Sequence, residues 1–166
     1  MQKKTFSEEF RKIKLEYEKS SAGKLGFTCS TRTFEGCPAL SLEKPSWTSG
    51  PARIFFSIWT DNDTTTNRVH YNIHAFKLRQ FKGHVITSRE FADEFRRHFK
   101  SVRQEWPNES TEYGPLNLMQ GWIDFSTTTF ERDVITLMTR FEKVSAIIDR
   151  MLEKRLVPFR RPGQLR

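Results

Sequence analysis

The sequence predicts an α+β fold, a mostly antiparallel four-stranded sheet packed on helices in the order α-β-β-β-α-β-α. Residues 52–60 and 68–76 alternate apolar and polar side chains around a polar turn, as the strands of an antiparallel hairpin do. Three other segments repeat apolar residues at helical spacing, and they enclose and interrupt the strand-like runs. The length of 166 residues suits one domain. We therefore expect a single α+β domain at 1–157 and a basic C-terminal tail at 158–166.

Each predicted helix begins with a capping box, in which a Thr and a Glu three residues later bond to backbone N–H groups. Apolar residues then recur every three or four positions, so that each helix has one face to bury. The third helix is the longest and ends before Pro158. The boxes run from Thr5 to Glu8, from Thr87 to Glu90 and from Thr128 to Glu131.

The predicted strands are residues 25–34, 52–60, 68–79 and 118–126, and the alternation of the third changes phase at Phe76, which predicts a bulge, a bend or burial on both faces. Residues 35–51 are rich in Pro, Gly and Ser, which predicts a loop that contains a short extended piece at residues 39–42. The core should be rich in phenylalanine, because the chain has 15 of them. The side chains expected to be buried are Phe10, Ile54, Phe56, Ile58, Phe91, Phe95, Phe141 and Ile148.

The charge of the chain points to an anionic partner. The formal net charge is +8 and the sequence pI is near 9.7, values that attract polyanions without identifying one. DNA or RNA is therefore the leading expected partner. The predicted nucleic-acid-binding residues crowd the polar faces and the end of the second helix: Arg89, Arg96, Arg97, Lys100 and Arg103.

A second candidate site lies on one face of the predicted hairpin. If the apolar residues of 68–76 face the helices, then His70, Asn72 and His74 face away from them, beside Trp59 of the neighbouring strand. Such a face could bind a ligand, stack bases or meet a second copy of the chain. The two histidines are about 13 Å apart along the strand, so we expect no metal site.

The order of elements resembles the core of the restriction-endonuclease-like nucleases. Those enzymes bind Mg²⁺ through an acid that ends the second strand and a Glu/Asp-x-Lys sequence on the third. Asp61 matches the first acid, Lys77 the lysine, and Glu8 or Glu9 could supply a helix carboxylate. Ala75, however, stands where the family has its central acid. The resemblance therefore favours nucleic-acid binding without nuclease activity.

Other signatures of chemistry are missing from the sequence. There is no Gly-rich phosphate loop, HExxH or GxSxG motif. Cys29 and Cys37 have neither a CxxC spacing nor a zinc pattern. We predict no cofactor, and the sequence leaves open whether the protein is an enzyme. With no secretory h-region and no apolar run of about 18 residues, we expect a cytoplasmic protein without a membrane partner.

The sequence therefore favours a non-catalytic binding protein with nucleic acid as its leading partner. One alternative is a small-molecule-binding or enzymatic domain that uses the Trp59, His70 and His74 face. Another is a protein-interaction module that forms a homodimer. The dimer is suggested by the long apolar stripe of the third helix, part of which could meet a second copy through Met138, Ile147 or Leu152.

Overall fold

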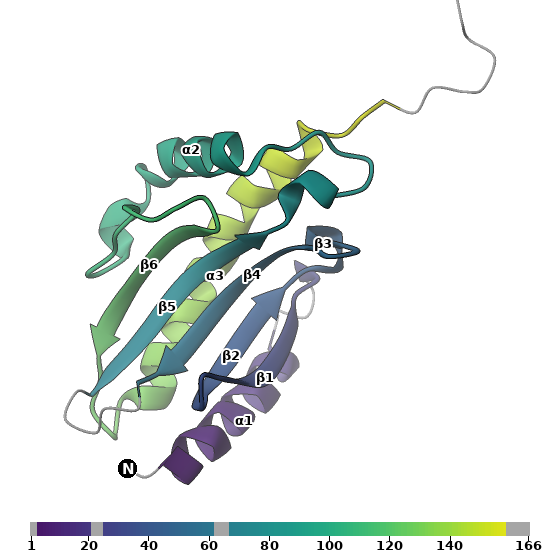
Figure 1. The fold of residues 1–166 in the computed structure, drawn as a ribbon. Coiled ribbons are helices and arrows are strands. Elements are labelled where there is room, and N and C mark those ends of the chain that lie inside the picture. Colours follow the sequence, from purple (N-terminus) through teal and green to yellow (C-terminus); the bar gives the residue numbers. More distant parts are fainter. Residues whose placement is uncertain (1–2, 21–24, 62–66, 159–166) are drawn as a thin grey trace, which may run out of the picture.

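A computed structural model describes residues 3–20, 25–61 and 67–158. The predicted basic tail lies outside these residues, apart from Pro158. Within these residues the chain forms three α-helices and six strands, with five of the strands following the first helix (Figure 1). The elements are α1 (Lys3–Lys19), β1 (Thr28–Phe34), β2 (Cys37–Glu43), β3 (Thr48–Ser49), β4 (Ala52–Thr60), β5 (Arg68–Phe76), α2 (Ser88–Phe99), β6 (Asn117–Asp124) and α3 (Phe130–Glu153).

The strands form one antiparallel sheet in the order β1-β2-β4-β5-β6, and the two-residue β3 adds to β4. This arrangement confirms the predicted α+β class. The predicted hairpin is also present, with Phe56 paired with Ile73 and Ser57 paired with Asn72. The count of four strands was wrong, because the sheet has six.

The strand β2 occupies part of the segment expected to be a loop, where the sequence predicted only a short extended piece at residues 39–42. A tight turn joins it to β1, where Phe34 pairs with Cys37. Both turn residues, Glu35 and Gly36, have positive φ angles of 48° and 78°, as a two-residue type I′ turn requires. The strand lies between β1 and β4, and six of its seven residues are buried. Burial on both faces removes the polar alternation that reveals a strand.

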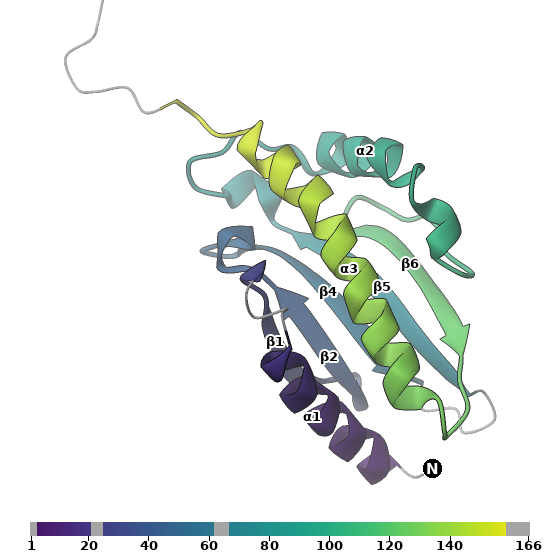
Figure 2. The same cartoon turned by 180° about the vertical axis from the view of Figure 1, so that it is seen from behind.

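The helices cover one face of the sheet and leave the other face open (Figure 2). Helix α1 packs against β1 and β2, and α2 packs against α3 and β6. All eight side chains predicted to be in the core are at most 1% exposed. The rings of Phe56 on β4 and Phe141 on α3 stack with their centroids 4.3 Å apart, which joins the sheet to its longest helix.

The predicted helix starts were displaced at two of three positions. Helix α1 begins two residues before Thr5, and α3 begins at Phe130 with Thr129, not Thr128, as its N-cap. The Thr129 hydroxyl accepts a hydrogen bond from the backbone N–H of Ser126, so it closes the preceding turn instead of capping the helix. Thr87 does occupy the N-cap of α2, but its side chain makes no capping bond.

The apolar stripe of α3 is used within the chain itself. Met138, Ile147 and Leu152 are 0%, 7% and 5% exposed. These side chains are therefore buried within the chain and cannot contact a second copy. The reason for expecting a dimer through this helix is removed. No helix among the described residues is long and apolar enough to cross a membrane.

Candidate functional site

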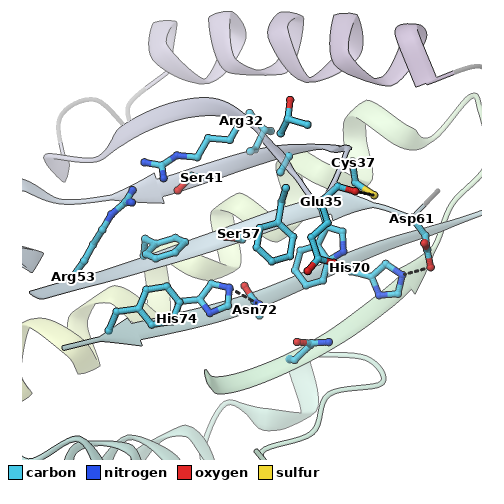
Figure 3. Close-up of a pocket in the computed structure, with 18 residues that line it drawn as sticks. Arg32, Glu35, Cys37, Ser41, Arg53, Ser57, Asp61, His70, Asn72 and His74 are labelled. Atoms are coloured by element: carbon cyan, nitrogen blue, oxygen red, sulfur yellow. Dashed lines mark hydrogen bonds and ion pairs between the residues drawn. The ribbon is translucent and has the colours of Figure 1, made fainter. Parts of the chain in front are cut away.

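The sheet face opposite the helices, here called the open face, carries a groove of about 730 Å³ (Figure 3). All five long strands and the β1–β2 turn contribute to its lining. This volume is in the range of pockets that bind small organic ligands. The groove exists because the outward-facing side chains of a twisted sheet meet no helix on this side.

A row of polar side chains crosses the groove at right angles to the strands. Ser41 on β2 pairs with Ser57 on β4, and Ser57 pairs with Asn72 on β5. Asn72 in turn pairs with Gln120 on β6. Because paired residues point to the same face of a sheet, these four side chains form one line of hydrogen-bonding groups, the central polar row.

Aromatic rings flank the central polar row on both sides. On one side Trp59 and His70 stack with their ring centroids 5.4 Å apart. On the other side Phe55 and His74 lie 4.9 Å apart, and Phe76 lies 4.9 Å from His74. The two aromatic pairs are four residues apart along β4 and β5, or about 13 Å. The groove therefore has apolar walls around a polar floor.

Two atoms of that floor have no hydrogen-bond partner among the described residues: Ser41 Oγ and Asn72 Oδ1. Ser41 and Asn72 are only 2% and 3% exposed. Asn72 uses its amide nitrogen instead, and Nδ2 donates to Nε2 of His74 over 2.8 Å. Native proteins leave few buried polar atoms unpaired, so this floor calls for a partner from outside the chain.

Both histidines of the groove are held in their neutral form. Burial lowers the pKa of His74 to about 4, against the opposing effect of the Leu116 carbonyl. Burial also lowers the pKa of His70, although Asp61 lies 3.7 Å from its Nε2 and raises it. The middle of the groove is therefore uncharged at neutral pH.

The two ends of the groove differ in charge. At one end Arg53 donates two hydrogen bonds of 2.8 Å to Glu43, and Arg32 lies 3.6 Å from the same carboxylate. Both guanidinium groups lie over the Phe55 ring, at 4.4 Å and 5.9 Å. At the other end the lining includes two carboxylates, those of Glu35 and Asp61 (Figure 3). The end with Arg32 and Arg53 has two positive charges and one negative charge, that of Glu43, so this end of the groove is positive.

The structure brings together all four residues predicted for the ligand or stacking face, since Trp59, His70, Asn72 and His74 all line the groove. Sequence reasoning missed the residues that β1 and β2 supply. Arg32 and Ser41 could be placed only if residues 37–43 were known to form a strand. The polar Ser41 inside an otherwise apolar run was the available signal.

The residues predicted to bind nucleic acid do not line the groove. Arg89, Arg97 and Lys100 are exposed on α2 and just after it. Arg96 is engaged within the chain, because its guanidinium donates to the backbone carbonyls of residues 113, 114, 117 and 118. Arg103 pairs with Glu109. Arg96 is thus tied into the fold, and the others form a surface separate from the open face.

The nuclease-like arrangement does not form either. Asp61 follows Thr60, at one end of the β4–β5 hairpin, whereas Lys77 follows Phe76, at the opposite end. Among the described residues no group of three His, Cys, Asp or Glu side chains could hold a metal ion. The open face therefore offers hydrogen bonds, aromatic rings and a positive end. Comparison of the chain with family models, curated proteins and solved structures gave no match.

Proposed function

We propose that this domain binds a small, flat, anionic ligand in the groove of the open face. The observation that carries the proposal is the unpaired, buried Ser41 Oγ and Asn72 Oδ1 on the groove floor. A buried polar atom without a partner costs about 1–3 kcal/mol. A ligand that donates hydrogen bonds to these atoms removes this unfavourable free energy when it binds. The unpaired atoms therefore favour the bound state.

The walls and the end of the groove define the rest of the ligand. Phe55 and Trp59 present ring surfaces on the two sides of the central polar row, and flat rings pack well against such surfaces. Arg32 lies at the rim with 42% of its side chain exposed, so that it can turn toward an anion. Guanidinium groups bind carboxylates and phosphates through two parallel hydrogen bonds.

Single-stranded nucleic acid is a second candidate function, as the composition suggested. The net charge of +8 supports it, as do the rings of Trp59 and His70, because basic groups beside aromatic rings suit single strands. It ranks second because the exposed arginines of α2 do not line the groove.

A titration with 6-hydroxy-2-naphthoate, followed by calorimetry, tests the proposed function. This probe has a flat ring, a carboxylate for Arg32 and a hydroxyl donor for the polar row. We expect a Kd below about 1 mM, which corresponds to about −4 kcal/mol. Arg32→Gln should weaken binding about tenfold, as loss of a charged hydrogen bond does.

Arg97→Gln is the matched control, since it removes the same charge from the exposed face of α2. It should leave the affinity for 6-hydroxy-2-naphthoate unchanged. Equal losses in the two variants would mean that the probe responds only to net charge. That result, or no binding at all, contradicts the proposed function.

A further inference from the structure

We propose that the ligand of the groove is a mononucleotide, with its base over the central polar row and its phosphate bound by Arg32 at the positive end. This inference rests on the proposed function and specifies its ligand. Three features of the groove lead to it: the direction of the unmade hydrogen bond, the spacing of the rings and the charges at the two ends.

The first feature is that the unpaired atom of Asn72 is an acceptor. Its Nδ2 group already donates to Nε2 of His74, and the amide oxygen is the atom left without a partner. The ligand must therefore bring an N–H or O–H donor into an uncharged site. The edges of nucleobases carry such N–H donors, and they remain neutral when they do so. Ser41 Oγ, in the same row, can donate or accept.

The second feature is the ring spacing. The pair formed by Trp59 and His70 and the pair formed by Phe55 and His74 lie about 13 Å apart along the strands. A purine or pyrimidine fits in this interval over Ser57 and Asn72 and can stack on one of the two ring pairs, because the interval is too wide for it to stack on both. Bases stack on aromatic side chains with about 1–3 kcal/mol each, and this contact does not depend on the identity of the base.

The third feature is the placement of charge. Glu43 neutralises only one of the two arginines at the positive end, and Arg32 keeps the longer contact of 3.6 Å. Arg32 is therefore the cation that can turn to a phosphate while Arg53 keeps Glu43 in place.

The opposite end distinguishes a mononucleotide from a strand. A strand that continued along the groove would bring its next phosphate toward Glu35 and Asp61, which line that end. Like charges at such short range oppose binding. The groove therefore accommodates one phosphate, and it favours a free nucleotide over an oligonucleotide.

Calorimetry with adenosine 5′-monophosphate tests this inference, with cytidine, guanosine and uridine 5′-monophosphates as companions. Adenosine and ribose 5-phosphate serve as fragments that lack the phosphate or the base. We expect at least one mononucleotide to bind at least about tenfold more tightly than either fragment. Arg32→Gln should weaken the mononucleotide about tenfold and leave adenosine nearly unchanged, whereas Arg97→Gln should change neither.

The floor is tested with Asn72→Leu, which should weaken both adenosine and the mononucleotide. Ser41→Ala, a smaller change in the same row, replaces it if Asn72→Leu does not fold. Binding of 6-hydroxy-2-naphthoate without binding of any mononucleotide would overturn the inference and leave the proposed function standing. Tighter binding of a ten-residue oligothymidylate than of any mononucleotide, with no effect of Arg32→Gln, would also overturn it.

Discussion

Asn72 and His74, two residues apart on β5, are joined by a 2.8 Å hydrogen bond from Nδ2 to Nε2. The bond requires a neutral imidazole, because Nε2 accepts it. Burial enforces that state by lowering the pKa of His74 to about 4. The same residue keeps its carbonyl oxygen as a buried acceptor without a partner among the described residues. The pair therefore links the protonation state of one histidine to the hydrogen-bonding capacity of the site.

Acid should destabilise the fold through His74, because its imidazole is neutral in the folded chain and becomes protonated in the unfolded chain. The pKa of His74 falls from 6.5 to about 4 on folding, so between these values the unfolded chain binds more protons. The free energy of unfolding is therefore unaffected by protonation of His74 above pH 6.5, and it decreases as the pH falls from 6.5 toward 4. We expect a loss of about 1–2 kcal/mol, reduced by partial solvent screening.

Urea unfolding at several pH values measures this effect. The His74→Gln variant should show a flatter profile than the parent between pH 6.5 and 4. A variant profile parallel to that of the parent would mean that His74 does not carry this pH dependence.

Removal of Phe141 should be costly, because this ring joins the sheet to α3. It stacks on Phe56 at 4.3 Å and lies 4.9 Å from the ring of Trp106. Phe141→Ala should lower the free energy of unfolding by about 3–5 kcal/mol, since it leaves a cavity. Leu15→Ala, at a residue 52% exposed on α1, is the control and should change it by less than about 0.5 kcal/mol. Similar losses in both variants would contradict this packing.

The elements with one exposed face were predictable from the sequence, and those without one were not. Residues 52–60 and 68–76 alternate clearly, so the hairpin and its core face follow from the pattern. The strand β2 is buried on both faces and begins beside Gly36 and Pro38, which are typical of loops. Its Ser41 and its pairing with Arg32 on β1 depend on strand order, which no local pattern contains.

About half of the candidate site was predictable, because only the β4–β5 hairpin shows a clear alternation of apolar and polar residues. Trp59, His70, Asn72 and His74 follow from alternation within one hairpin. The role of Arg96 was not predictable, because its carbonyl partners lie in the irregular segment before β6 and at the start of that strand, and no local pattern shows that this segment folds against α2. A basic helix face looks the same in sequence whether its arginines are free or bound.

Arg96 should therefore matter for stability. Arg96→Gln removes donors to four backbone carbonyls, two in the segment before β6 and two at the start of β6. Because these acceptors are left underpaired, we expect a loss of about 1–3 kcal/mol in the free energy of unfolding. Arg97→Gln, on the exposed face of the same helix, should have almost no effect. Equal stability of the two variants would refute this role.

Gly121 should tolerate no side chain. A Cβ atom there would lie 2.3 Å from the hydroxyl oxygen of Tyr71 and 3.0 Å from the carbonyl oxygen of Asn108. Gly121→Ala should destabilise the fold by about 1–3 kcal/mol through overpacking. The Cζ atom of the Tyr71 ring would lie only 2.5 Å away, so Tyr71→Ala, which removes both atoms, is the partner variant. The double variant should lose less than the sum of the single variants. A strictly additive thermal-denaturation cycle would contradict this contact.

The most direct test of the groove as a binding site is a nuclear magnetic resonance titration that follows the four tryptophan indole N–H signals and the Asn72 side-chain amide. With 6-hydroxy-2-naphthoate added, we expect the signals of Trp59 and Asn72 to shift and those of the buried Trp47 and Trp106 to stay in place. Shifts confined to residues outside the groove, or none at millimolar probe, would contradict binding on the open face.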